Sequence, residues 1–367
     1  MTDPSAGPDR NTARHALVIG ATGIAGGALV RRLLDEGWQV TGVSRRPGRL
    51  PEPAALVNVD LTSTADTHEA LAGVPATHVF VTAWVRRETE DENIAVNRAI
   101  VRDVLEALRP SETVQHVALM TGLKHYLGPF EAYGQGEVRD TPFHEDEERL
   151  PYPNFYYAQE DELWAAAERD GFTWSVHRAH TVIGTAVGNA MNMAQTLAVQ
   201  ASICRELDRP FVFPGSRTQW DGLTDMTDAE LLAEHMIWAS TEEVAANESY
   251  NIANGDVFRW RWMWPRIAEH FGVTPEGFAD EPRPLEQQMV DAAEEWRTVA
   301  ARYSLKVDDV DQLASWWHTD GDLGRDVECL TDMRRSRVRG FTGYRSTIDS
   351  FERVFGELRA QSLVPPR

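Results

Sequence analysis

The chain is poor in lysine, cysteine and long apolar runs, and these shortages exclude whole classes of protein. No apolar run reaches the roughly 18 residues that a membrane-spanning helix needs. The two cysteines, Cys204 and Cys329, lie far apart, which excludes a disulfide framework and suits a reducing cytoplasm. The 11 histidines form no HExxH motif, so we expect no metal. The net charge of −21 argues against nucleic acid and anionic membranes as partners.

Lysine is the scarcest of the charged residues. Only two of the 36 basic residues are lysines, Lys124 and Lys306, and the rest are arginines. Arginine is effectively always charged and forks rigidly, whereas lysine is a compact ammonium that can polarise one neighbouring oxygen. A chain that otherwise uses arginine keeps a lysine in Thr121-Gly-Leu-Lys-His-Tyr126. Lys124 is therefore a candidate for chemistry, although an arginine-biased composition could also leave one lysine by chance.

Short apolar runs alternate with helical segments along the first half of the chain. The predicted strands are 16–20, 38–43, 55–59, 78–82, 115–120 and 173–177. The first predicted helix runs from the glycine turn to about residue 36, and the later ones cover 64–72, 92–108 and 155–169. This alternation predicts an α/β fold, a Rossmann-type doubly wound parallel sheet with helices on both faces.

The pattern changes beyond Gly184. Longer helical stretches are predicted at 191–207, 227–239, 284–302 and 346–359, with short strands at 211–213 and 249–252. We therefore expect a disordered leader over 1–14, a dinucleotide-binding domain over 15–184, and a smaller, mainly helical substrate-binding lobe over 185–367. The lobe is expected to pack against the first domain and to return short strands to it.

A glycine-rich turn predicts a dinucleotide site. Gly20-Ala-Thr-Gly-Ile-Ala-Gly26 follows the first predicted strand directly and opens the first helix, in the spacing typical of short-chain dehydrogenases. Glycines let the backbone approach a pyrophosphate, and the helix N-terminus supplies N–H groups and a positive dipole. The predicted contacts here are Gly20, Thr22, Gly23, Ile24 and Gly26.

The ends of the later strands predict which dinucleotide binds. The second strand ends in Ser44-Arg45-Arg46, where an NAD site would carry an acidic residue for the ribose 2′-hydroxyl. Two arginines and a hydroxyl suit a 2′-phosphate, which predicts NADPH/NADP+; the alternative is a solvated basic turn. Further cofactor contacts are predicted at Asp60, Leu61, Thr82, Ala83, Trp84, Thr121, Gly122 and Val182.

The usual reactive pair of short-chain dehydrogenases, Tyr-x-x-x-Lys, is missing. Four residues after Tyr156 stands Glu160, and four residues after Tyr157 stands Asp161. Asn154 is a predicted N-cap, which would place Tyr156 in a first helical turn, where the positive end of the helix favours an anion. The alternative for Tyr156 is a core aromatic beside its neighbours.

Several segments resemble one known family, the progesterone 5β-reductase/iridoid synthase-like enone reductases, an atypical branch of the extended short-chain dehydrogenases. The similar segments are 121–131, 154–161, 175–178, 191–192, 220–222, 233–238 and 254–258. The resemblance implies that Lys124 and Tyr156 are catalytic. It also implies hydride transfer from NADPH to the β-carbon of an α,β-unsaturated carbonyl compound, while the tyrosine hydroxyl, with the lysine close by, stabilises the enolate oxygen.

The expected pocket differs from that of the plant members. Ala179 follows Arg178 in place of proline, and His318 stands where plant members commonly place phenylalanine. The candidate pocket residues are Phe130, Tyr133, Met191, Met193, Trp220 and His318, with Trp84 beside them. Of these, Phe130, Tyr133, Trp84, Met191 and Met193 could equally belong to the core. The resemblance implies an apolar enone or enal as the small-molecule substrate, and steroids, monoterpenoid dialdehydes and small cyclic enones all stay open.

Two rival functions also stay open. A carbonyl reductase, or a sugar-nucleotide epimerase or dehydratase, would use the same scaffold, but the missing Tyr-x-x-x-Lys pair counts against them. A non-catalytic NADPH-sensing regulator would tend to lose the reactive pair, which is intact here. The sequence favours a cytoplasmic NADPH-dependent oxidoreductase that reduces enones, and it leaves a homodimer open.

Overall fold

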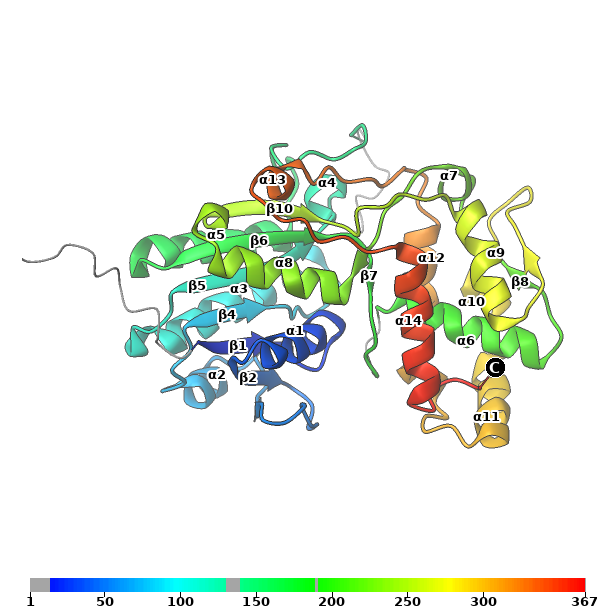
Figure 1. Ribbon diagram of the computed structural model, residues 1–367, viewed down its shortest axis with the longest axis horizontal. Helices are drawn as coiled ribbons and strands as arrows, with labels where there is room; N and C mark the ends of the chain where they lie inside the picture. The colour runs from blue at the N-terminus through cyan, green and yellow to red at the C-terminus, as the bar shows by residue number, and fades with distance from the viewer. Residues whose placement is uncertain (1–13, 130–138, 189–190, 367) are drawn as a thin grey trace, which may run out of the picture.

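A seven-stranded parallel sheet forms the body of the molecule (Figure 1). The computed structural model describes residues 14–129, 139–188 and 191–366. The sheet strands are β1 His15–Ile19, β2 Gln39–Ser44, β3 Ala55–Asn58, β4 His78–Val81, β5 His116–Gly122, β6 Thr173–Ala179 and β10 Glu248–Ile252. Their order is β10-β6-β5-β4-β1-β2-β3. The order reverses between β1 and β4, and ligands of open parallel sheets bind at such a reversal.

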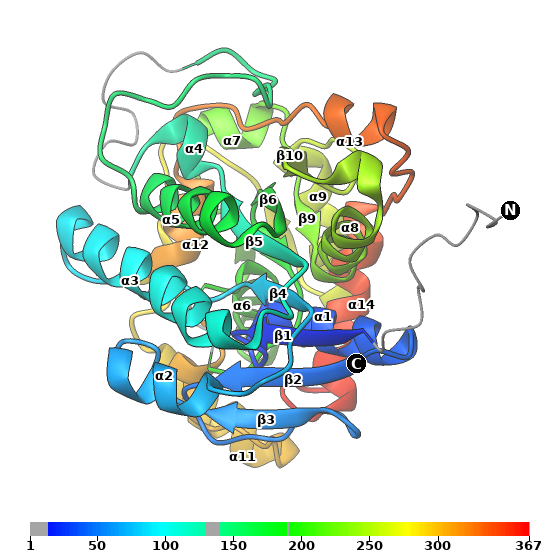
Figure 2. The same cartoon turned by 90° about the vertical axis from the view of Figure 1, so that its left-hand side faces the viewer.

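Helices cover both faces of the sheet, which confirms the predicted fold class. Helices α1 (Ile24–Asp35) and α8 (Ala229–Thr241) lie on one face, and α2 (Thr64–Leu71), α3 (Glu90–Leu108) and α5 (Phe155–Asp170) on the other (Figure 2). Side chains alternate between the two faces along each strand. In β1, Ala16 and Val18 accordingly pack toward α1, while Leu17 and Ile19 pack toward α3. Burial on both faces explains why these strands are continuous apolar runs.

The second half of the chain returns to this sheet. Strand β10 pairs with β6 from Glu248↔Ser175 to Ile252↔Ala179, and α8 packs against α1. The second half of the chain therefore supplies a strand and a helix to the sheet of the first half. The predicted domain boundary at residue 184 stays a prediction.

The remaining elements form a mainly helical lobe beside the sheet (Figure 1). Its helices are α6 Met193–Glu206, α7 Arg217–Asp221, α9 Trp260–Phe271, α10 Leu285–Gln288, α11 Ala292–Tyr303, α12 Trp316–Leu323 and α14 Thr347–Ala360. The other short elements are α4 Lys124–Leu127, α13 Arg334–Val338, β7 Val182–Ile183, β8 Phe211–Val212, β9 Thr227–Asp228, β11 Pro275–Glu276 and the 3-10 turns Arg109–Ser111, Glu243–Ala245 and Val310–Gln312. Helix α9 was not predicted from the sequence, and the single helix predicted over 284–302 is in fact two helices, α10 and α11.

Hydrogen-bonded histidines cross from the sheet to α8. His116 on β5 lies 2.9 Å from Ser175 Oγ, and Ser175 Oγ lies 2.8 Å from His177 Nε2 on the same strand, β6. His177 Nδ1 in turn lies 2.8 Å from His235 Nδ1 on α8. Burial lowers the pKa of His116 and His177 well below 6.5 and that of His235 to about 3. The folded protein therefore keeps these rings neutral at pH values where the unfolded chain takes up protons.

The fold should lose stability as the pH falls below about 6.5. Below that value the unfolded chain binds more protons than the folded one. The free energy of unfolding then drops by about 1.4 kcal/mol per pH unit for each such histidine, until the folded-state pKa is reached. Glu145 gives the opposite slope between 4.5 and 7, because burial raises its pKa to about 7. Burial also lowers the pKa of His78 to about 4 and that of His125 to about 3. It raises the pKa of Glu160 and Asp320. Among the described residues, the histidines with lowered pKa values outnumber the carboxyls with raised ones. Urea unfolding followed from about pH 7.5 to about pH 5 measures the net slope.

Two variants separate the buried histidines from exposed ones. His235→Phe removes one buried ring and should reduce the pH slope by about one proton. His144→Asn is the control, because the His144 side chain is 54% exposed. An unchanged slope in His235→Phe would show that acid lability arises elsewhere.

Candidate active site

Two adjoining cavities lie at the edge of the sheet where the parallel strands end. The larger, of about 440 Å³, is lined by the glycine turn and by residues that follow β2, β3 and β4. The smaller, of about 200 Å³, is lined by residues from β5 and β6, from α4 and α5, and from α12. Gly23, Thr82, Trp84 and Met191 line both cavities, so the two form one cleft over the reversal of strand order.

The glycine turn brings backbone close to the cleft. Gly20 has a φ of +89°, and a Cβ there would lie 2.9 Å from the Cβ of Ala83. Gly23 is the N-cap of α1, so the N-terminus of the helix opens onto both cavities. Thr22 lines the larger cavity and Ile24 the smaller. A cradle that a side chain would fill, at a helix N-terminus, fits the pyrophosphate of a dinucleotide.

Gly26 belongs to the turn but not to the cavity lining. A Cβ on Gly26 would lie 2.2 Å from the carbonyl oxygen of Gly20, so this glycine allows α1 to pack against the turn. Gly26 therefore shapes the turn without lining either cavity, and its predicted contact with the cofactor stays a prediction.

The end of β2 supplies a hydroxyl and two arginines to the larger cavity. Ser44 Oγ lies 2.9 Å from Thr22 Oγ1 and accepts a hydrogen bond from the backbone N–H of Arg46 at 3.3 Å. The Arg46 guanidinium donates to the carbonyl of Gly188 at 3.0 Å, which ties the turn to the segment after β7. Arg45 also lines this cavity. The predicted 2′-phosphate residues are thus brought together at one end of the cleft.

The structure adds two arginines that the sequence analysis missed. Arg86 and Arg87, shortly after β4, line the same cavity as Arg45. Hydrogen bonds from the backbone and side chain of Thr62 lower the pKa of Asp60, and Arg45 and Arg87 lower it further. The position of Arg86-Arg87 just beyond the predicted contact Trp84 was the signal available in the sequence.

The two predicted catalytic side chains line the smaller cavity together. Lys124 is the first residue of α4, immediately beyond β5, and Tyr156 lies in the first turn of α5. Asn154 caps α5: its side-chain oxygen accepts from the N–H of Tyr156 at 3.0 Å, and its amide donates to the carbonyl of Lys124 at 2.7 Å. One side chain thereby fixes the lysine backbone to the helix that carries the tyrosine.

The surroundings of Tyr156 keep its phenol protonated. The residue is 9% exposed, and burial, followed by the nearby Glu90, raises the pKa of the phenol above 10. A Cβ on Gly122 would lie 3.4 Å from the phenol oxygen, so the hydroxyl lies against backbone at the end of β5. Lys124 is 5% exposed, and its ammonium lies 5.9 Å from the centre of the Phe155 ring. The cavity thus brings a protonated hydroxyl and the lysine side chain together, and both residues are largely buried from water.

The neighbouring Tyr157 has a structural role. Its hydroxyl donates to the carbonyl of His125 at 2.7 Å and accepts from the N–H of Leu150 at 3.0 Å. Of the two adjacent tyrosines, only Tyr156 lines the cavity.

The other predicted residues divide into those that line the cleft and those that do not. The lining ones are Asp60, Leu61, Thr82, Ala83, Trp84, Thr121, Gly122, Val182, Met191 and His318. Two predicted pocket residues lie elsewhere. Met193 is buried in the core of the lobe, and Trp220 packs with its ring centre 4.9 Å from that of Phe213. Phe130 and Tyr133 lie outside the described residues.

Part of the cleft wall was not predicted. His180 and Thr181 follow β6, and Asp322 and Arg325 lie on or just after α12; all four line the smaller cavity. Their side chains are polar, in contrast to the mostly apolar pocket residues that were predicted from the sequence.

One group of described side chains could hold a metal, and it lies apart from the cleft on α2 and α3. It consists of His68, Asp103 and Glu106. Asp103 already accepts hydrogen bonds from Thr64 Oγ1 at 2.6 Å and from Arg102 at 2.8 Å. That the protein uses no metal stays a prediction.

Three features define a Rossmann-type protein of the extended short-chain dehydrogenase architecture. They are the strand order, the glycine turn at the point where that order reverses, and the helical lobe. The UDP-glucose 4-epimerase of Thermotoga maritima has this architecture: its structure covers 94% of this chain and 99% of its own, with a TM-score of 0.67. Its sequence is 15% identical, so this similarity shows the fold alone.

Sequence comparison identifies the family. The family described as PRISE-like Rossmann-fold domain matches residues 55–365, and the chain belongs to this family, as predicted. The (S)-8-oxocitronellyl enol synthase of Camptotheca acuminata is 38% identical, over 95% of this chain and 93% of its own. The 3-oxo-Δ(4,5)-steroid 5β-reductase of Arabidopsis thaliana is 36% identical, over 98% of this chain and 95% of its own.

Adjacent glycines at the start of α1 should respond oppositely to alanine. A Cβ on Gly26 meets the Gly20 carbonyl, so Gly26→Ala should lower the free energy of unfolding by about 1–3 kcal/mol, as overpacking does. A Cβ on Gly27 has its nearest neighbour 3.7 Å away, so Gly27→Ala should raise it by up to about 1 kcal/mol through helix propensity. Urea unfolding of both variants measures the difference. A stable Gly26→Ala protein would mean that the turn is looser than described.

Proposed function

We propose that the protein reduces the C=C bond of α,β-unsaturated carbonyl compounds with NADPH, by adding hydride to the β-carbon. The observation that carries this proposal is the presence of Lys124 and Tyr156 in one small cavity that adjoins the dinucleotide cleft. Both named relatives act on oxo compounds, one as an enol synthase and the other as a 5β-reductase. A reaction that passes charge onto a carbonyl oxygen suits a site with one hydroxyl donor and one ammonium.

The cleft has groups for each part of the cofactor. Arg45 and Arg46 would hold the 2′-phosphate, and the turn from Gly20 to Gly23 would hold the pyrophosphate. When bound, NADPH supplies the hydride. The continuity of the two cavities through Thr82 and Trp84 would bring its reactive ring beside Tyr156.

The residues of the smaller cavity would stabilise the developing enolate. Tyr156, kept protonated by burial, donates a hydrogen bond to the carbonyl oxygen of the substrate as negative charge grows there. Lys124 adds a fixed positive charge in the same cavity. Because burial from water strengthens both interactions, such preorganised groups commonly supply several kcal/mol of transition-state stabilisation. Protonation of the α-carbon then completes the reduction.

We also propose that the substrate is a small molecule and that the protein acts in the cytoplasm, with a homodimer left open. Among the described residues, no helix is long and apolar enough to cross a membrane.

Product analysis tests the reaction type. Because the site stabilises an enolate, enones should yield the saturated carbonyl compound, and isolated ketones should not react. NADPH oxidation against enones and matched saturated ketones, with products identified by mass spectrometry and NMR, measures this. An allylic alcohol as the main product would favour a carbonyl reductase instead.

Cofactor preference should depend on the two arginines after β2. Loss of one charge-assisted pair costs about 1.5–3 kcal/mol. Arg45→Ala and Arg46→Ala should therefore raise KM for NADPH by about 10- to 150-fold and change KM for NADH little. Arg49→Ala is the matched control, because Arg49 is exposed and is not among the residues that line the cavity. Wild-type enzyme that uses NADH as well as NADPH would contradict the assignment.

Lysine at position 124 should not be replaceable by arginine. The guanidinium is broad, planar and suited to two oxygens, so it should not fit beside one phenol and one enolate oxygen. Lys124→Arg should lower kcat by about 100-fold, or about 2.7 kcal/mol, with little change in NADPH affinity. Lys124→Met and Tyr156→Phe provide the comparison with loss of each group. Full kcat in Lys124→Arg would show that only charge matters there.

A further inference from the structure

One wall of the smaller cavity carries paired charges that the proposed reaction does not use. It consists of His318 and Asp322 on α12, Arg325 just after that helix, and His180 and Thr181 after β6. The reactive pair comes from other elements, α4 and α5. We call these five residues the α12 wall. Buried polar groups are costly unless they are hydrogen-bonded, so the bonding of this wall indicates what it can receive.

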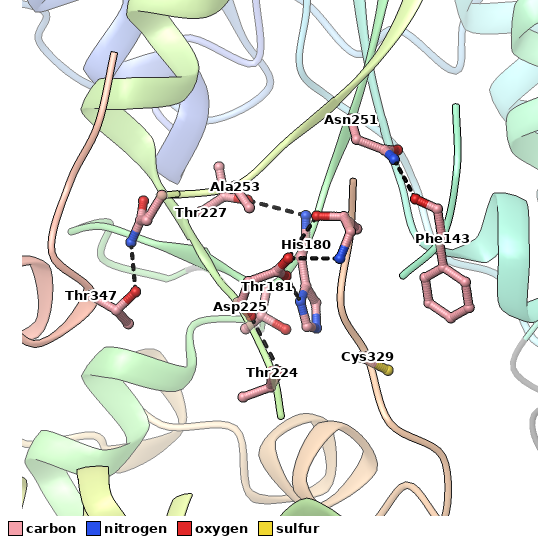
Figure 3. A network of polar contacts seen from close by, with 12 residues as sticks. Phe143, His180, Thr181, Thr224, Asp225, Thr227, Asn251, Ala253, Cys329 and Thr347 are labelled. Atoms are coloured by element: carbon pink, nitrogen blue, oxygen red, sulfur yellow. Dashed lines mark hydrogen bonds and ion pairs between the residues drawn. The ribbon is translucent and has the colours of Figure 1, made fainter. Parts of the chain in front are cut away.

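His180, in the inner part of the wall, has partners at both ring nitrogens. His180 Nδ1 lies 2.7 Å from Asp225 Oδ1, and the Arg325 guanidinium lies 3.3 Å from His180 Nε2 (Figure 3 shows His180 beside Asp225). A guanidinium can only donate, so Nε2 accepts and the Nδ1 proton goes to Asp225. The second oxygen of Asp225 accepts from the N–H and hydroxyl of Thr331 at 2.8 and 2.7 Å. This part of the wall positions Arg325, and the ring of His180 has its bonds satisfied.

Asp322 has acceptor capacity left. Its Oδ2 accepts a hydrogen bond from Thr181 at 2.9 Å, while Arg325 Nη2 lies 3.7 Å from its Oδ1 and His318 Nε2 lies 3.9 Å from its Oδ2. The last two distances are too long for hydrogen bonds. Burial alone would raise the pKa of Asp322, but Arg325, His318 and His180 outweigh burial and hold the pKa below its usual value. The group is a carboxylate, which only accepts.

His318 has donor and acceptor capacity left. Its Nδ1 is buried, and no described residue forms a hydrogen bond with that atom. Burial lowers the pKa of the ring; Arg325, Arg86 and Lys124 lower it further, and Asp322 opposes them. The ring is therefore neutral near pH 7, with one N–H donor and one acceptor nitrogen.

The gap between these two residues suits one hydroxyl group. An oxygen atom about 2.8 Å from both His318 Nε2 and Asp322 Oδ2 can bridge the 3.9 Å between these atoms, accepting from an Nε2 proton and donating to the carboxylate. We propose that His318 and Asp322 bind a hydroxyl group of the substrate, so that the preferred substrate is an enal or enone with a hydroxyl remote from its conjugated carbonyl. A carboxylate fits less well, because it would face the Asp322 carboxylate. The inference rests on the proposed 1,4-reduction.

Paired substrates test the inference. The probes are ω-hydroxy α,β-unsaturated aldehydes of increasing chain length, the matching unsubstituted aldehydes and the ω-carboxy analogues. Wild-type kcat/KM should favour the best hydroxy aldehyde over its unsubstituted partner by about 10-fold or more, the value of one hydrogen bond to a charged group. His318→Phe and Asp322→Asn should each bring this ratio toward one. The ratio is taken within each variant, so it does not depend on a change in overall rate.

Gly321→Ala is the matched control. It lies on α12 between the two residues, and a Cβ there has no atom within 4 Å, so the ratio should stay at its wild-type value. A ratio near one in the wild type at every chain length would overturn the inference, as would a ratio that survives in both variants. Preference for the carboxy analogues would show that the α12 wall binds an anion, and it would overturn the inference as well.

The unsubstituted aldehydes keep the two proposals apart. If they are reduced at the C=C bond and the hydroxy group brings no gain, 1,4-reduction stands and the α12 wall has no role in recognising a hydroxyl. If no aldehyde is reduced, the proposed function fails and this inference fails with it.

Discussion

The site depends on one constraint of the sheet: all seven strands are parallel, so their carboxyl ends meet at a single edge. Each strand from β1 to β6 delivers its following residues there. Residues far apart in the chain therefore become neighbours without any local signal joining them. The cleft residues that follow β1 to β6 in turn include Gly20, Arg45, Asp60, Trp84, Lys124 and His180.

Asn154 links the two reactive residues, Lys124 and Tyr156, which this arrangement places on separate elements. In a Tyr-x-x-x-Lys site, one helix fixes both reactive side chains, because residues four apart lie on the same face. Here the lysine follows a strand and the tyrosine opens a later helix, so nothing in the secondary structure alone sets their separation. The Asn154 side chain bonds to Lys124 with its amide and to Tyr156 with its oxygen. The capping residue Asn154 thus fixes the relative position of two residues on separate elements, as helical spacing fixes that of two residues on one helix.

The sequence was sufficient where a local pattern has one physical cause. Continuous apolar runs predicted strands buried on both faces, and a glycine turn after the first run predicted the position of the cleft. Helix α9 had a signal too, since Trp260, Met263, Trp264 and Ile267 follow helical spacing, but Pro265 inside the helix obscured it. Met193 and Trp220 could not be placed, because an apolar side chain packs equally well in a core or against a ligand.

Apart from His318, which was a predicted pocket residue, the α12 wall could not be predicted, because no pattern connects its members. His180 and Arg325 come from separate segments, and their contact exists only after β6 and α12 are assembled. Each residue alone is an ordinary polar position. Their shared role follows from distances, which a single sequence does not contain.

Net charge and local charge give different information about partners. The total of −21 disfavours a long polyanion, whose many charges would lie near many carboxylates. A small anion samples only the charges around it, since those beyond about 8 Å are largely screened at physiological ionic strength. In the larger cavity these are four arginines, Arg45, Arg46, Arg86 and Arg87, around one carboxylate, Asp60. An acidic protein can therefore offer a basic site, because its arginines follow β2 and β4, the two strands on either side of β1, and meet where those strands end.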